Sequence, residues 1–251
     1  FFNLRASHVQ QQILLITGWG GGTALLNPLQ QALTAHGFRV ELINIFNAAD
    51  AQVMQQQGEF ARQFDVIIGW SLGGQLATLL VDAIASQYAE YKTLISITSN
   101  PCFVAQADWD TAMPQATFAQ FKQSFAQDPI LTLKRFGFMV CQGVSSSKTD
   151  LLQLQSLVQP QPQSLLQQGL NLLENLNLVK MLKSYPGQQY HLFAEQDVLV
   201  DCKVALKLQN LAAKFLSVDV LPGSHGLPLF HANELTSKIC QYLQKNPSTQ
   251  V

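Results

Sequence analysis

Along the first hundred residues, short apolar runs alternate with segments in which apolar residues recur at helical spacing. Short, apolar-rich runs that suit parallel strands occur at 13–17, 40–45, 66–68 and 93–97. Segments with the spacing of amphipathic helices lie between them, at 24–36, 51–63 and 72–87. Because alternating strands and helices are typical of βαβ units, this part of the chain is predicted to form a parallel sheet covered by helices.

The pattern changes after residue 107. From 108 to 183 no strand is predicted, and four helices are expected, at 118–125, 129–141, 148–158 and 162–182. Alternation then resumes, with strands at 190–193 and 217–221 and helices at 203–214 and 229–243. We therefore predict an α/β core of residues 1–107 and 183–251 and an inserted four-helix lid of residues 108–182. Insertions at the carboxyl ends of strands lie over the ligand crevice of open α/β sheets.

Composition narrows the function classes. Of the 251 residues, 47% are hydrophobic and 12% are charged, whereas a disordered chain combines low hydrophobicity with high charge. The 15 basic residues are balanced by 16 acidic ones, so a chain-wide nucleic-acid surface is not expected. No apolar run approaches the ~20 residues of a membrane span. The chain begins at Phe1 without a signal-peptide pattern, which leaves open whether residues precede it.

The four cysteines are far apart and form no CxxC pair; they are Cys102, Cys141, Cys202 and Cys240. A zinc site needs clustered ligands, so no metal is expected. We expect free thiols in a cytoplasmic protein, and a disulfide in a periplasmic protein is the alternative.

A G-x-S-x-G motif stands at 69–73, with Ser71 at its centre. It directly follows an apolar strand and precedes a helix, which is the setting of a nucleophile elbow. Glycines suit such a sharp turn because neighbouring Cβ atoms would clash in it. Ser71 is therefore the candidate nucleophile, and a glycine-rich turn without catalytic role is the alternative.

A serine hydroxyl needs a base, and in elbow hydrolases an acid and then a histidine follow the serine along the chain. Of the five histidines, only His225 follows Ser71 in a loop between the last strand and the last helix. The acid is expected after the preceding strand, where Glu195, Asp197 and Asp201 are candidates. Asp197 is favoured because apolar residues follow it and could bury it against the imidazole, whereas Asp201 suits a helix N-cap.

Acyl transfer also needs N–H donors for the developing oxyanion. The residue after the nucleophile, Leu72, is one candidate. The loop at 18–21 follows the first strand, and its Trp19 N–H is predicted to be the other donor. A glycine loop needed only for a tight turn is the alternative.

The elbow, the order Ser71, Asp197, His225 and the inserted helices resemble the α/β-hydrolase superfamily. Several segments more narrowly resemble the bacterial pimeloyl-[acyl-carrier protein] methyl ester esterases of biotin synthesis. These segments are 15–20, 69–74, 99–103 with Trp109 beyond, 135–136 and 221–225.

The resemblance implies a serine esterase without cofactor that removes the methyl ester from a pimeloyl group held by an acyl-carrier protein. It supports the triad and oxyanion donors already named. It further implies that Phe136 on the lid lines the acyl channel and that Arg135 and Lys148 meet the acidic carrier protein. Trp70, beside the nucleophile, is expected to contact the substrate as well.

The chain departs from that family in three places. Thr17 replaces a usual histidine, residues 44–50 replace a D-x-P-G-x-G-x-S segment, and Leu131 and Leu152 lie near positions of lid arginines. Within 122–149, four basic residues against one acidic residue leave a net charge of +3. Such a patch is expected to steer an acidic partner weakly and in a salt-dependent way, and a solvated helix face is the alternative.

Taken together, the sequence predicts a cytoplasmic, monomeric serine carboxylesterase acting on pimeloyl-carrier protein methyl ester, with neither nucleic acid nor membrane as partner. Two other functions stay open. One is a general small-ester or thioester hydrolase without a carrier-protein partner, and the other is a non-catalytic binding protein of the same fold.

Overall fold

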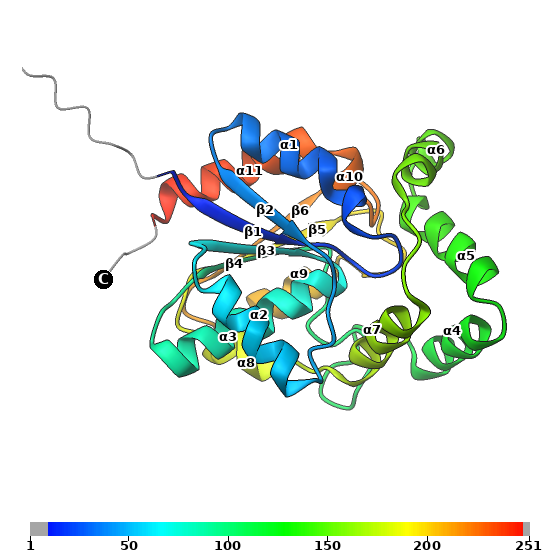
Figure 1. The fold of residues 1–251 in the computed structure, drawn as a ribbon, viewed down its shortest axis with the longest axis horizontal. Helices are drawn as coiled ribbons and strands as arrows, with labels where there is room; N and C mark the ends of the chain where they lie inside the picture. The colour runs from blue at the N-terminus through cyan, green and yellow to red at the C-terminus, as the bar shows by residue number, and fades with distance from the viewer. Residues whose placement is uncertain (1–9, 248–251) are drawn as a thin grey trace, which may run out of the picture.

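The computed structural model describes residues 10–247 and contains a six-stranded parallel sheet between two layers of helices (Figure 1). The strand order is β2-β1-β3-β4-β5-β6. The strands are β1 (Gln12–Ile16), β2 (Arg39–Ile43), β3 (Val66–Trp70), β4 (Thr93–Ile97), β5 (Gln189–Ala194) and β6 (Leu216–Leu221). The predicted strands and the α/β class are confirmed, with each end within about two residues of its expected position.

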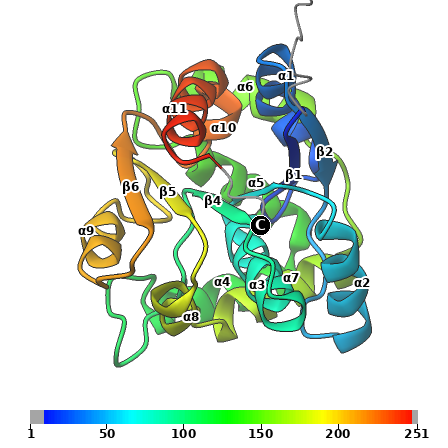
Figure 2. The ribbon, with the colours of Figure 1, turned by 90° about the vertical axis from the view of Figure 1, so that its left-hand side faces the viewer.

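Helices cover both faces of the sheet, as Figure 2 shows in the view along it. One face carries the 3-10 turn η1 (Thr23–Leu26), α1 (Asn27–Ala35), α10 (Leu227–Phe230) and α11 (Ala232–Lys245). The other carries α2 (Ala51–Ala61), α3 (Leu72–Tyr88), α8 (Val179–Ser184) and α9 (Val204–Gln209). The strands β3 and β4 are buried along their whole length, which explains why their sequences are apolar on both faces.

Four further helices separate β4 from β5 and lie beyond the carboxyl ends of the strands (Figure 1). They are α4 (Gln115–Gln127), α5 (Pro129–Cys141), α6 (Ser147–Leu157) and α7 (Gln163–Asn175). The start of α5 is set by its own sequence: Asp128 accepts a hydrogen bond from the Leu131 N–H at 3.0 Å, and Pro129 occupies the first helical position.

The single helix predicted at 162–182 is wrong, because the structure divides it into α7 and α8. Around the break, Asn177 forms an antiparallel bridge with Cys102, and the Leu178 N–H donates to the Pro101 carbonyl at 2.9 Å. Pairing with a distant segment therefore overrides the helical spacing of the leucines. The predicted helices at 24–36, 203–214 and 229–243 are likewise shorter or divided.

All four cysteines are free thiols, with Cys102 and Cys141 buried. No helix within residues 10–247 is long and apolar enough to cross a membrane.

Candidate active site

Ser71 occupies a strained turn between β3 and α3. Its φ of 56° and ψ of −121° lie outside the regions that L-residues favour, and its N–H donates to the Ile97 carbonyl at 2.9 Å. Neighbouring side chains have no room: a Cβ on Gly69 would lie 2.0 Å from a backbone oxygen, and one on Gly73 would lie 2.3 Å from the Ile16 carbonyl oxygen. The glycines of the motif are thus required by close backbone packing.

The three residues predicted as a triad meet at the carboxyl edge of the sheet. His225 Nε2 lies 3.0 Å from Ser71 Oγ, and its Nδ1 lies 2.8 Å from Asp197 Oδ2. Since a carboxylate only accepts hydrogen bonds, Nδ1 carries the proton and Nε2 presents its lone pair to the hydroxyl. The side chains of His225 and Asp197 are 1% and 0% exposed, so this arrangement is shielded from water.

Asp197 is fixed by the chain that follows it. Its Oδ1 accepts the Leu199 N–H at 2.8 Å and the Val200 N–H at 3.0 Å. The other two candidate acids are engaged elsewhere: Glu195 accepts from the Gln196 side chain, and Asp201 accepts the Lys203 N–H at 2.9 Å. The geometry therefore favours Asp197 over both.

The main chain of His225 is held by contacts that the sequence did not suggest. Its carbonyl accepts the Trp70 Nε1–H at 2.9 Å and the Thr98 hydroxyl at 3.2 Å. The next N–H, that of Gly226, donates to the Val140 carbonyl of α5 at 3.1 Å. Trp70, expected to contact the substrate, is buried beside His225 and holds its carbonyl, and it also lines a larger cavity between α5, α6 and the loop after β1.

The loop at 18–22 brings Trp19 beside the nucleophile. A Cβ on Gly18 would lie 3.2 Å from Ser71 Cβ, which places this loop against the elbow. Within residues 10–247 the Trp19 N–H has no protein acceptor, as suits an oxyanion donor. Thr17 Oγ1, at the position where a histidine was expected, donates to the Gly22 carbonyl at 3.1 Å and closes the loop.

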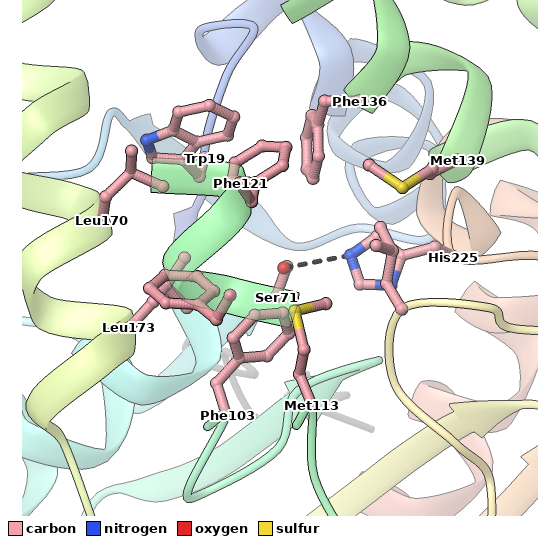
Figure 3. Close-up of a pocket in the computed structure, with 12 residues that line it drawn as sticks. Trp19, Ser71, Phe103, Met113, Phe121, Phe136, Met139, Leu170, Leu173 and His225 are labelled. Carbon is pink, nitrogen blue, oxygen red and sulfur yellow. Dashed lines mark hydrogen bonds between the residues drawn. The ribbon is translucent and has the colours of Figure 1, made fainter. Parts of the chain in front are cut away.

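A small apolar cavity of about 30 Å³ opens beside Ser71 (Figure 3). Apart from Ser71 and His225, the described side chains that line it are apolar and include Trp19, Phe103, Met113, Phe121, Phe136 and Leu173. In such surroundings fixed dipoles act strongly on a developing charge. Phe136, expected in the acyl channel, is part of this wall.

Not every basic residue of the inserted helices α4 to α7 is free to bind an acidic partner. Lys122 forms an ion pair with Glu174 of α7. Lys134, Arg135 and Lys148 are exposed and form no ion pair with another described residue. Three cations are therefore free to meet an acidic partner.

Comparison with known structures identifies the fold. A bromoperoxidase from Bacillus anthracis superposes with a TM-score of 0.78 and 17% identity, covering 94% of this chain and 92% of its own. An esterase from Exiguobacterium antarcticum gives a TM-score of 0.75 and 15% identity over 93% and 92% of the two chains. The chain therefore has the α/β-hydrolase fold.

Curated relatives narrow the class. No family model matches the chain. The pimeloyl-[acyl-carrier protein] methyl ester esterase of Vibrio cholerae is 32% identical over 216 residues, covering 80% of this chain and 82% of the relative. The protein of that name from Shewanella woodyi is 29% identical over 251 residues, with 94% of each chain covered. The chain belongs to the pimeloyl-[acyl-carrier protein] methyl ester esterase family.

Proposed function

We propose that the chain is the serine esterase that hydrolyses the methyl ester of pimeloyl-acyl-carrier protein in biotin synthesis. The observation that carries the proposal is the buried Ser71–His225–Asp197 arrangement, which opens into an apolar cavity in a member of this family. Residues 108–182 act as a lid over the core formed by 1–107 and 183–251. The protein works as a cytoplasmic monomer.

In the proposed reaction, Ser71 Oγ attacks the ester carbonyl while His225 Nε2 takes its proton. The oxyanion of the tetrahedral intermediate is stabilised by the Trp19 and Leu72 N–H groups, each worth ~3 kcal/mol in related sites. His225 then protonates the departing methoxide, and methanol leaves. Water, deprotonated by the same imidazole, hydrolyses the acyl-enzyme and frees Ser71. Asp197 keeps the imidazole in the required tautomer throughout.

Arg135 and Lys148 are proposed to meet the acidic carrier protein. Both are exposed on neighbouring helices, α5 and α6, and neither is paired with another described residue. Because exposed charges are screened by salt, this docking contributes mainly to the rate of encounter and weakens as ionic strength rises.

A general small-ester hydrolase is the second candidate. It is favoured by the pairing of Lys122 with Glu174, which leaves few cations for an acidic partner. The two candidate functions are distinguished by comparing kcat/KM for carrier-bound methyl pimelate with kcat/KM for free methyl pimelate. A carrier-specific enzyme prefers the bound ester, and the preference falls with added salt.

The test is rescue of a biotin-requiring bacterial strain that lacks its own esterase of this family. The wild-type chain restores growth without biotin, and Ser71→Ala does not. Ser237→Ala, a change at an exposed serine of α11, is the matched control and rescues as the wild type does. Failure of the expressed, folded wild type to rescue would reject the biotin role.

A further inference from the structure

The last turn of α5 is in contact with the loop that carries the catalytic base. Val140 is the next-to-last residue of this helix, and its carbonyl accepts the Gly226 N–H at 3.1 Å. A carbonyl so near a helix end has no partner within the helix, so it is available to a neighbouring loop. Because Gly226 directly follows His225, this bond fixes the main chain on one side of the base. Figure 3 shows Met139, from the same turn, on the His225 side of the cavity.

Gly143, two residues beyond the end of α5, makes a second contact, with the loop that carries the acid. A Cβ on Gly143 would lie 2.2 Å from the Gln196 carbonyl oxygen, so the two main chains touch with no room for a side chain. The φ of Gly143 is 101°, a backbone conformation that glycine adopts readily and other residues rarely. The Gln196 carbonyl belongs to the peptide bond that leads into Asp197. The end of α5 and Gly143 therefore support the acid and the base together.

Apolar packing holds this turn in place. Val140 and Cys141 are each 1% exposed and lie in one apolar cluster with Leu199 and Leu227. Leu199 donates its N–H to Asp197 Oδ1 at 2.8 Å, and Leu227 lies two residues past the base. Because the core around them is closely packed, the turn cannot move away from one catalytic loop without disturbing the other.

We propose that Gly143 is a positioning residue of this esterase: together with the last turn of α5, it holds the acid and the base in the geometry that catalysis requires. The inference rests on the proposed function, because it takes Asp197 as the acid and His225 as the base. Their hydrogen bond of 2.8 Å sets the tautomer and the orientation of the imidazole. Gly143 touches neither side chain and acts through the main chain of the acid loop.

An alanine at position 143 has to open this contact. Its Cβ would move from 2.2 Å to at least 3.0 Å from the Gln196 oxygen, the closest approach that Cβ atoms make to other heavy atoms. The difference is ~0.8 Å, and a misplacement of ~1 Å in a catalytic site costs up to ~100-fold in rate. In Gly143→Ala, kcat for methanol release from dimethyl pimelate therefore falls at least about tenfold, while KM stays within about threefold of the wild-type value.

Gly37→Ala is the matched control. Gly37 is exposed, as Gly143 is, and has a φ of 91°. Apart from its chain neighbours, no atom of residues 10–247 lies within 4 Å of a Cβ placed on Gly37. Both variants thus introduce the same kind of backbone strain and lower the Tm, but only Gly143→Ala displaces the acid loop. Gly37→Ala keeps kcat within about twofold of the wild type.

The hydrogen bond between acid and base provides a readout that a general loss of stability does not change. The proton between His225 Nδ1 and Asp197 lies in a short, charge-assisted hydrogen bond, and its proton NMR signal moves upfield as that bond lengthens. The signal is identified by its absence from Asp197→Asn, in which Nδ1 carries no proton. It moves upfield in folded Gly143→Ala and stays in place in Gly37→Ala.

Val140→Ala serves if Gly143→Ala does not fold. It keeps the carbonyl that binds Gly226 but loosens the packing of the turn, so kcat falls about threefold or more and the NMR signal moves in the same direction. Val81→Ala is its control, because Val81 of α3 is also 1% exposed. That variant loses a similar amount of Tm but keeps the kcat and the NMR signal of the wild type.

The outcomes separate the positioning role from the proposed function. The role is overturned if, in folded Gly143→Ala, either kcat stays within about twofold of Gly37→Ala or the NMR signal stays in place. If that variant does not fold, equal kcat in Val140→Ala and Val81→Ala overturns the role. If the wild type does not hydrolyse dimethyl pimelate, the proposed function fails, and the NMR signal still decides whether Gly143 positions the acid against the base.

Discussion

Replacing Asp197 by asparagine changes one atom at the most sensitive point of the site. The buried Asp197 Oδ1 accepts two N–H groups, at 2.8 Å and 3.0 Å, and asparagine retains an oxygen for them. The opposite orientation would leave both N–H donors unsatisfied, at about 1–3 kcal/mol each. The asparagine NH₂ therefore faces His225 Nδ1, where the carboxylate of the wild type accepts at 2.8 Å.

An NH₂ group donates, so the imidazole carries its proton on Nε2 in this variant. That nitrogen lies 3.0 Å from Ser71 Oγ and, once protonated, cannot take the serine proton. A wrong tautomer of this kind costs about 10⁴ in kcat, or ~5.5 kcal/mol of transition-state stabilisation. KM stays within a few-fold of the wild type because the apolar cavity is unchanged.

The assay is steady-state methanol release from dimethyl pimelate, with thermal unfolding measured in parallel. Asp201→Asn and Glu195→Gln are matched controls, since both acids lie near Asp197 but bond elsewhere. They are expected to keep kcat within about threefold, a cost of up to ~0.7 kcal/mol. The assigned role of Asp197 is refuted if a folded Asp197→Asn retains more than about a tenth of the wild-type kcat. It is also refuted if kcat falls as far in Asp201→Asn as in Asp197→Asn.

Other expectations follow from packing, burial and loop contacts. Gly69→Ala sets a Cβ 2.0 Å from a backbone oxygen and lowers both Tm and activity, whereas Gly58→Ala, with open space around it, raises the Tm or leaves it unchanged. Burial lowers the pKa of His191 to about 3, so this histidine is neutral in the folded protein while the unfolded chain takes up a proton below about 6.5. The contribution of neutral His191 to the free energy of unfolding is therefore fully present above pH 6.5 and falls between pH 6.5 and 3 by up to ~1.4 kcal/mol per pH unit. Denaturant titrations at a series of pH values check this. In His191→Gln the free energy of unfolding loses this part of its dependence on pH. Gln196 Oε1 accepts the Gly223 N–H at 2.7 Å and joins the acid loop to the histidine loop, so Gln196→Ala lowers kcat about tenfold with little change in KM; an unchanged kcat would contradict this positioning role.

The fold and the triad could be predicted because each leaves a recognisable pattern in the sequence. Strands β3 and β4 are apolar on both faces since helices cover both. The glycines of the motif around Ser71 are recognisable in the sequence, although the backbone that requires them is near for Gly69 and distant, at Ile16, for Gly73. The order of serine, acid and histidine left few candidates, and burial of Asp197 distinguishes it from its exposed neighbours.

The features that could not be predicted depend on residues far apart in the chain. Trp70 lies 155 positions from the carbonyl that it holds at His225, and Lys122 lies 52 positions from Glu174, which neutralises it. Leucines at helical spacing continue from α7 into α8, yet the chain leaves the helix there to pair with Cys102. Neither the hydrophobic periodicity of the sequence nor a count of its charges indicates which distant residues will be in contact.

The central claim is that Ser71 carries out hydrolysis of a methyl ester on a carrier-bound pimeloyl group. Intact-mass measurement of methyl pimeloyl-carrier protein after incubation with the enzyme tests it most directly. The account predicts that the wild type removes one methyl group from each substrate molecule and leaves the thioester intact, and that a folded Ser71→Ala leaves the substrate unchanged. Loss of the whole acyl group, or equal conversion by Ser71→Ala, would contradict it.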